Sequence, residues 1–188
     1  MSRIGTQQHY RAGERIDLDP DSTLAIHEGV VALTVIHEDG AEVLLGLCGP
    51  GHVLAGHPAD GCSIQLQTYT GARVSIEPWT AAVRWPDFFE RLRHRLRTME
   101  AWAAMQARPQ IEQRLLGILS LLAGQFGRRG PKGTLIEVRI THAQLASAVG
   151  ATRATVTRRL GALRRRGLLL SVGSGAGKRL CLRTEESR

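Results

Sequence analysis

Residues 138–184 contain ten basic residues and no aspartate or glutamate, and this one-sided charge limits what the chain can fold into. Like charges repel one another in a compact fold unless a polyanion binds beside them. Within this stretch, residues 150–167, GATRATVTRRLGALRRRG, hold six arginines and three threonines. The sequence therefore predicts a surface for nucleic acid. A cationic helix on a membrane surface is the alternative, but the stretch lacks the aromatic anchors typical of such helices.

The positive charge is confined to the second half of the chain. Residues 1–88 contain five basic and eleven acidic residues, a net charge of −6, whereas all 188 residues together carry +8. The remaining residues therefore carry +14. With the patterns below, this asymmetry leads us to expect a β-rich domain over 1–88, a dimerisation helix over 89–108 and a basic domain over 109–188.

Residues 14–84 read as short strands separated by turns. The segment HEDG, residues 37–40, has the Asp-Gly signature of a tight hairpin, and residues 48–61 form a loop rich in glycine and proline. No helical pattern longer than a turn or two interrupts the segment, so we expect a small antiparallel roll or barrel. The expected strands are TLAIHEG (23–29), VVALTVI (30–36), AEVLLGL (41–47), CSIQLQTYT (62–70) and ARVSIEP (72–78).

A helical pattern begins at residue 89 and ends before Pro109, which has no N–H to donate. Its apolar positions are spaced by three and four residues, as on one face of a two-helix contact. An amphipathic helix lying on its own β-domain would show the same spacing, so both interpretations stay open. The residues of this candidate dimerisation stripe are Leu92, Leu96, Met99 and Ala103. A second apolar helix is expected from residue 111 onward.

Residues 134–182 predict a winged helix-turn-helix. A turn-rich connector (127–133) leads to a strand-like run, TLIEVRI, over 134–140. Thr141 is a candidate N-cap for a helix over 142–149, Gly150 supplies a turn, and Thr152 is a candidate N-cap for a helix over 153–166. Two β-runs around a glycine-rich tip (168–182) complete the layout.

On a helical wheel of residues 153–166, Val156, Leu160 and Leu163 form a narrow stripe that we expect to be buried. The opposite face carries Gly161 and two alanines among arginines. Glycine costs up to about 1 kcal/mol relative to alanine in a helix, so small residues there indicate a surface that something approaches closely. A structural helix whose arginines are merely solvated would not need glycine and alanine on this face.

Recognition helices contact base edges mainly through their N-terminal turns, and arginine can bind a guanine edge with two hydrogen bonds. The residues that we expect to contact bases are Arg153, Ala154, Thr157 and Arg158. Hydroxyls near helix N-termini and cations farther along suit backbone phosphates. The residues that we expect to bind phosphates are Thr141, Thr152, Thr155, Arg164, Arg165, Arg166, Lys178 and Arg179.

The segments RLLGILSLLAGQFG (114–127) and THAQLASAVGATRATVTRRLGALRRRGLL (141–169) resemble the DNA-binding region of the Crp/Fnr transcription factors, and most closely that of the cyanobacterial global nitrogen regulators. The resemblance implies an α+β fold: a shortened cyclic-nucleotide-binding-like β-roll, a long dimerisation helix and a C-terminal winged helix-turn-helix. It implies a homodimer that binds near-palindromic double-stranded DNA and activates or represses transcription, with RNA polymerase as a candidate partner.

The resemblance assigns base contacts to Arg153, Ala154 and Arg158. Many members have glutamate where Ala154 stands, so the preferred half-site should be nearer to that of the nitrogen regulators than to that of the cyclic-AMP receptor. Arg159 is a second departure, because that position is often apolar in the family.

The resemblance also indicates where an effector would bind. Members that bind cyclic nucleotides carry a Gly-Glu pair followed by Arg-Ser/Thr-Ala, and the corresponding residues 51–66 contain neither the glutamate nor the arginine. We therefore expect no binding of cyclic AMP or GMP. Binding of 2-oxoglutarate, as in the nitrogen regulators, would use Arg95 and Glu100. A β-domain that binds nothing is the other interpretation, and we expect no cofactor.

A metal- or haem-sensing regulator is a competing function, because the β-rich segment contains several histidines and cysteines. Its candidate ligands are His27, His37, His52, His57, Cys48 and Cys62, with His52, His57 and Cys62 the first to test. No HxH or CxxC spacing is present, so surface or structural roles are favoured and we expect no metal site. With Cys181, the three unclustered cysteines fit a reducing compartment.

Other protein classes fit the sequence less well. A metal-dependent β-barrel enzyme would need paired histidines and a carboxylate, and no nucleophile arrangement stands out, so we expect a protein that is not an enzyme. A non-specific DNA-coating protein would need the charge but not the placement of Arg153 and Arg158. No apolar stretch is long enough to cross a bilayer, so we expect a cytoplasmic protein without a membrane partner.

Overall fold

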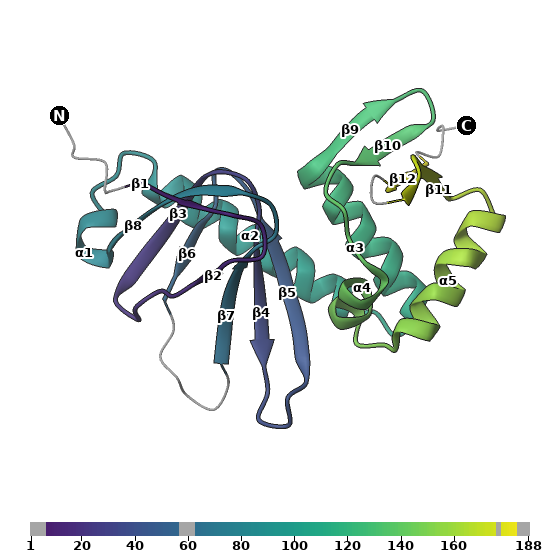
Figure 1. The fold of residues 1–188 in the computed structure, drawn as a ribbon, viewed down its shortest axis with the longest axis horizontal. Helices are drawn as coiled ribbons and strands as arrows, with labels where there is room; N and C mark the ends of the chain where they lie inside the picture. Colours follow the sequence, from purple (N-terminus) through teal and green to yellow (C-terminus); the bar gives the residue numbers. More distant parts are fainter. Residues whose placement is uncertain (1–6, 57–62, 176–177, 184–188) are drawn as a thin grey trace. The chain divides into compact units, whose positions relative to one another are not determined.

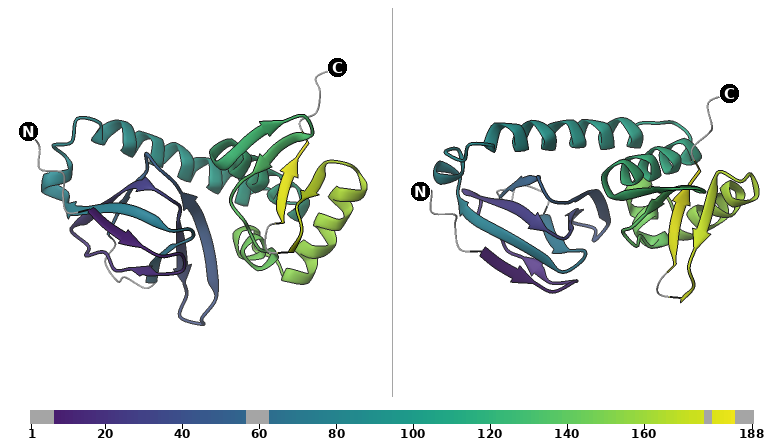
Figure 2. Two further views of the ribbon diagram at one scale, coloured as in Figure 1. Left: turned by 45° about the horizontal axis from the view of Figure 1, so that its top comes forward. Right: turned by 90° about the horizontal axis from the view of Figure 1, so that it is seen from above.

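A computed structural model describes residues 7–56, 63–175 and 178–183 of the chain (Figure 1). The chain divides into two compact units, Met1–Ala101 and Trp102–Arg188. The first is built mainly of strands and the second of helices with a small sheet (Figure 2). Among the described residues, none of the helices combines the length and the apolar character that crossing a membrane requires.

The first unit contains two four-stranded antiparallel sheets. Their strand orders are β1-β8-β3-β6 and β2-β7-β4-β5, so neighbours in a sheet come from distant parts of the sequence. This arrangement confirms the expected antiparallel roll. The strands are β1 (Gln7–Tyr10), β2 (Arg15–Ile16), β3 (Ser22–Glu28), β4 (Val31–Ile36), β5 (Glu42–Cys48), β6 (Val53–Ala55), β7 (Ser63–Thr68) and β8 (Ala72–Pro78).

The core of the first unit is formed by apolar side chains from both sheets. Leu24 and Val74, from the first sheet, and Val31, from the second, are completely buried. Strands β3, β4, β7 and β8 contribute alternate residues because successive side chains of a strand point to opposite faces. Burial of apolar surface therefore holds the two sheets together.

The hairpin predicted at residues 37–40 is confirmed. The Gly40 N–H donates to the His37 carbonyl over 2.9 Å, and the His37 N–H donates to the Ala41 carbonyl over 2.9 Å. Gly40 has φ of +79°, a conformation that residues with a Cβ rarely adopt. The expectation that 48–61 is only a loop is wrong in part, since Val53–Ala55 pairs with β3 as strand β6. Its apolar residues made that pairing favourable despite the surrounding glycines.

Two helices end the first unit. The short α1 (Trp79–Ala82) precedes the long α2 (Phe88–Gln106), which contains the boundary between the units. Phe88 is buried in a cluster with Val53 and Ala82, and Leu92 packs against that cluster. The start of α2 is therefore fixed on the β-rich unit. This contact agrees with the interpretation of an amphipathic helix that lies on its own β-domain.

Among its described residues, the second unit contains the end of α2, three complete helices and a four-stranded antiparallel sheet in the order β11-β12-β10-β9. Helix α4 packs against both α3 and α5. This order of helix, turn, helix and hairpin confirms the winged helix-turn-helix. Its elements are α3 (Ile111–Phe126), β9 (Gly127–Gly130), β10 (Gly133–Ile136), α4 (His142–Val149), α5 (Arg153–Arg165), β11 (Leu169–Val172) and β12 (Arg179–Leu182).

Two expectations about the start of this sheet were wrong. Residues 127–133, expected to be a connector, form a hairpin in which β9 pairs with β10 as an edge strand. Pairing with a neighbour overrides the low strand propensity of glycine and arginine there. The strand expected over 134–140 ends at Ile136, because the carbonyl of Glu137 accepts a hydrogen bond from Arg179 Nε over 2.9 Å instead of continuing a ladder.

Candidate nucleic-acid interface

Side-chain caps fix the starts of both helices of the helix-turn-helix, and a glycine ends the first of them. Thr141 and Gln144 form a capping box at the start of α4, in which each side chain bonds the other residue's backbone N–H. Gly150 ends α4 with φ of +60° and ψ of +52°. The Thr152 hydroxyl then accepts from the Thr155 N–H over 3.2 Å at the start of α5. The predicted roles of Thr141, Gly150 and Thr152 in the backbone are confirmed.

Helix α5 has one buried and one accessible face, as its sequence predicts. Val156, Leu160 and Leu163 are completely buried. On the opposite face Gly161 is half-buried, and a Cβ there would only reach ordinary contact distance, 3.7 Å, from Arg165 Nη1. A partner can therefore approach the α5 backbone there without a large side chain in between.

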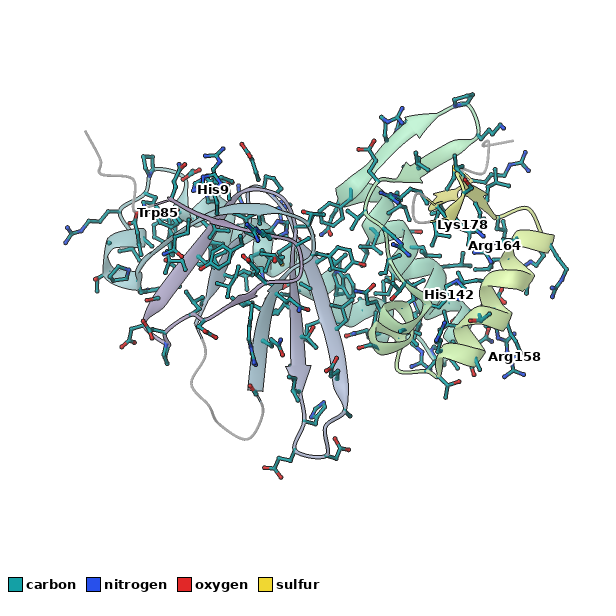
Figure 3. All side chains as sticks on the ribbon, in the orientation of Figure 1. His9, Trp85, His142, Arg158, Arg164 and Lys178 are labelled. Carbon is teal, nitrogen blue, oxygen red and sulfur yellow. The ribbon has the colours of Figure 1, made fainter. Side chains whose placement is uncertain are left out.

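The four residues expected to contact bases, Arg153, Ala154, Thr157 and Arg158, are all exposed on the first two turns of α5. We call these four residues the reading edge. Figure 3 shows Arg158 extending away from the fold on the outer side of α5. The Thr157 hydroxyl is already engaged: it donates to the Arg153 carbonyl over 2.8 Å and lies 2.8 Å from His142 Nδ1.

A pocket of about 510 Å³ lies next to the reading edge, lined by the start of α4, by α5 and by the wing hairpin β11–β12. Figure 3 shows His142, Arg164 and Lys178 gathered on this side of α5. We call it the basic pocket. Its cations and the hydroxyl of Thr141 give it the chemistry to hold an anion such as a phosphate. Its charged or titratable lining residues are Arg139, His142, Arg153, Arg164 and Lys178.

The surroundings of His142 disfavour the charged form of its imidazole. Burial lowers the pKa of its imidazole below the usual value of 6.5, and the positive charges of Arg164, Arg153 and Lys178 lower the pKa further. A bound anion would offset those charges. The pocket is therefore most cationic through its arginines and lysine, not through this histidine.

The structure brings some of the expected phosphate-binding residues together and separates others. Thr141, Arg164 and Lys178 all line the basic pocket, and Arg164 Nε donates to Ser171 Oγ of the wing over 3.1 Å. The hydroxyls of Thr152 and Thr155 lie 2.9 Å apart at the start of α5 and bond each other.

The other cations of this group have different surroundings. Arg165 is exposed on α5 and is not one of the residues that line the basic pocket. Arg179 donates to the Glu137 carbonyl. Arg166 forms an ion pair with Glu112 of α3, whose other carboxylate oxygen lies 3.9 Å from Arg159 Nη1. Two arginines of the α5 segment are thus partly neutralised within the unit.

Sequence reasoning missed three residues of this surface. Arg139 and His142 line the basic pocket, and Glu112 pairs with the arginines of α5. Arg139 lies in the stretch without acidic residues and His142 directly follows the N-cap Thr141, so the sequence could have indicated both as members of this surface. Glu112 had none, because it lies 54 residues from Arg166.

The candidate dimerisation stripe on α2 is largely accessible. Leu96 is 50% exposed and Met99 46% exposed, and Ala103 is exposed as well. Leu92 is half-buried against the first unit. Phe89, one turn before Leu92, is 72% exposed and extends the apolar stripe.

The two candidate effector residues do not share a surface of α2. Arg95 is 7% exposed and its Nη1 is buried without a hydrogen-bond partner, whereas Glu100 is exposed. Five residues apart on a helix, they lie about 140° from each other around the axis. A single ligand would therefore not reach both from one helix.

Two of the candidate histidines of the first unit, His52 and His27, make structural contacts. His52 is buried, with Nδ1 3.0 Å from the Gly49 carbonyl, and burial is the main cause that lowers its pKa to about 4. His27 Nε2 lies 2.9 Å from Ser75 Oγ. Within residues 7–56, 63–175 and 178–183, no three His, Cys, Asp or Glu side chains are grouped as a metal site would require. His57 and Cys62 lie outside the described residues.

Comparisons with known proteins agree with this geometry. A model of the Crp-like helix-turn-helix domain matches residues 113–183. The regulatory protein CysR of Synechococcus elongatus is 31% identical over 148 residues, 76% of this chain and 68% of that protein. The global nitrogen regulator of the same organism is 27% identical over 155 residues, 73% of this chain and 68% of that protein.

Solved structures share the fold over nearly the whole chain. A transcriptional regulator of the CRP/FNR family from Thermus thermophilus is 25% identical, with a TM-score of 0.71 over 94% of this chain and 93% of that chain. The FixK2 protein of Bradyrhizobium japonicum is 18% identical, with a TM-score of 0.75 over 97% of this chain and 94% of that chain.

Proposed function

Because the chain belongs to the Crp/Fnr family of transcription regulators, we propose that it acts as a homodimer on a near-palindromic DNA site, without a cyclic nucleotide. The observation that carries this proposal is the exposed reading edge beside the basic pocket. One surface then offers side chains for base edges and cations for the neighbouring phosphates.

The proposal gives the two parts of this surface different tasks. Arg153 and Arg158 would bind guanine edges in the major groove, which is wide enough to admit a helix. The basic pocket would hold a backbone phosphate between α4, α5 and the wing. Arg165, exposed on α5, would add affinity that depends on salt but not on base sequence.

The exposed apolar residues of α2 support a homodimer. Leu96 and Met99 leave a large part of their surface accessible on a helix that also presents Phe89 and Ala103. A second copy that packs along this stripe would bury them. The pair would present two reading edges to major grooves about 34 Å apart on a near-palindromic site.

The sequence between β5 and β8 supports a function without cyclic nucleotides. Residues 49–72 contain no arginine, lysine or glutamate that could bind a cyclic phosphate and a ribose. Arg73, which follows, forms a 2.5 Å ion pair with Glu28 and a 2.9 Å hydrogen bond with Gln7 Oε1. A charge already satisfied in this way is poorly suited to a second anion.

A salt series with two DNA duplexes tests the proposal. Binding to the promoter region of the protein's own gene is compared with binding to a random duplex of equal length. We expect tighter binding to the promoter, and we expect Arg158→Ala to remove that preference. Arg165→Ala removes one arginine from the same helix and is the matched variant. It should keep the preference for the promoter, and it should reduce the slope of log affinity against log salt concentration by about 0.9. Equal affinity of the wild type for both duplexes at every salt concentration would refute sequence-specific binding and favour a DNA-coating protein.

A further inference from the structure

The proposed DNA-binding role of the reading edge does not explain why the hydroxyl of Thr157 is bonded within the unit. Thr157 is exposed between Arg153 and Arg158, where a hydroxyl could bond to a base. Instead it donates to the carbonyl of Arg153, one turn earlier on the same helix, over 2.8 Å. A hydroxyl has a single proton, so this bond uses the only one that Thr157 has.

Because the Thr157 hydroxyl has a single proton, its two hydrogen bonds determine which ring nitrogen of His142 is protonated. A carbonyl oxygen can only accept, so toward His142 Nδ1, at 2.8 Å, the Thr157 oxygen must itself accept. Nδ1 therefore carries a proton, and the neutral ring of His142 has its lone pair on Nε2. Protonation of the ring would leave Nδ1–H in place. The bond between α4 and Thr157 thus exists in both charge states of His142.

The methyl group is the part of the Thr157 side chain that makes no hydrogen bond within the unit, and the oxygen has no proton left to donate to a partner. The side chain is exposed while its oxygen is bonded on two sides within the unit. Ala154, three residues earlier on the same face, is also exposed and ends in a methyl group. Residues three apart on a helix are neighbours, with Cβ atoms about 5–6 Å apart. The reading edge therefore contains a small apolar surface between two arginines.

We propose that Thr157 and Ala154 recognise the C5 methyl group of a thymine in each half-site, and that His142 is the positioning residue that turns the Thr157 methyl toward it. The inference rests on the proposed DNA-binding function. Among the four unmodified bases of DNA, thymine alone carries a methyl group at the major-groove edge, and apolar contact with it distinguishes thymine from cytosine. The same methyl group on 5-methylcytosine is the only other source of this chemistry.

Deoxyuridine provides the test, because it differs from thymidine only in lacking that methyl group. A binding site is first selected from random duplexes with the full-length wild-type protein. Each thymine of one half-site is then replaced by deoxyuridine, one at a time, and the affinities are measured. We expect one replacement to weaken wild-type binding about fourfold, the factor predicted by losing the burial of one methyl group.

Matched variants assign the effect to the methyl of Thr157. Thr157→Val keeps a methyl at that place and should retain the fourfold difference between the thymidine and deoxyuridine duplexes. Thr157→Ser keeps the hydroxyl and loses the methyl, so the difference should fall toward one. His142→Ala frees the hydroxyl to rotate and should reduce the difference, and nitrogen NMR of the wild-type imidazole should show the proton on Nδ1. Circular dichroism confirms that each variant is folded.

The outcomes separate this inference from the proposed function. Selection of no preferred site would overturn both. A preferred site at which every thymine can be replaced by deoxyuridine without loss would overturn the inference alone, as would an undiminished difference in Thr157→Ser. Tighter binding to 5-methylcytosine than to thymine at the sensitive position would overturn thymine as the recognised base.

Discussion

Glu112 limits the positive charge that α5 can offer to DNA, and its removal gives a measurable prediction. Its side chain is 23% exposed and pairs with Arg166 and, at 3.9 Å, with Arg159. Both arginines are more than half exposed, so each pair stabilises the fold by about 0–1 kcal/mol. Glu112→Gln should therefore lower the unfolding free energy by no more than about 2 kcal/mol. It should free Arg166, or both Arg166 and Arg159, from their ion pairs.

Each freed cation that reaches a phosphate steepens the dependence of log affinity on log salt by about 0.9. Glu112→Gln should thus steepen the slope by about 0.9–1.8, so that raising salt from 50 to 200 mM costs about 3.5-fold more affinity per added contact. Affinity for random duplex at low salt should rise together with affinity for the specific site.

Fluorescence anisotropy of a labelled random duplex measures this slope. Glu137→Gln is the matched control: it removes the same charge from the same unit, where Glu137 pairs with Arg128 at 2.8 Å. If Glu112→Gln leaves the slope unchanged, the arginines of the Glu112 cluster do not contact phosphates. If the control steepens the slope equally, net charge and not the release of Arg159 and Arg166 explains the effect.

Two further predictions concern the fold. Gly150→Ala should lower the unfolding free energy by about 1 kcal/mol in urea denaturation, and Gly150→Asn by less, because a Cβ there meets nothing closer than 3.6 Å and only the positive φ is unfavourable. In the folded protein the pKa of His52 is lowered to about 4 from its ordinary 6.5. The unfolded chain therefore binds a proton at this histidine before the folded protein does. The contribution of His52 to the unfolding free energy should be fully present above about pH 6.5 and should fall toward pH 4, by up to about 1.4 kcal/mol per pH unit. His52→Asn should flatten that part of the stability profile, and an equally steep profile would contradict the assignment.

The features that could be predicted from sequence are those set by neighbours in the chain. Thr141, Gly150 and Thr152 were identified as caps and turn because capping depends on residues two to four positions away. The buried stripe of α5 follows from helical periodicity in the same way. Strand β9 could not be predicted, because Arg128 and Arg129 form a strand only through pairing with β10.

The candidate interface shows the same division. The positions of Arg153, Ala154 and Arg158 on the accessible face follow from a helical wheel. The engagement of the Thr157 hydroxyl does not, since it depends on His142, which lies 15 residues away on another helix. Likewise nothing near Arg166 in the chain indicates Glu112. Contacts between helices decide which expected cations and hydroxyls are available to a ligand.

The link between α4 and α5 restricts how this protein could change its DNA target during evolution. One residue, Ala151, separates the α4 cap at Gly150 from the α5 cap at Thr152, and its N–H is bonded to the Ala146 carbonyl over 3.0 Å. An insertion or deletion there would change the spacing of the two caps, and one within α5 would turn the following residues by about 100° and expose the buried stripe. New specificities are therefore accessible through substitutions on the exposed face of α5, one position at a time, while the length of this segment stays fixed.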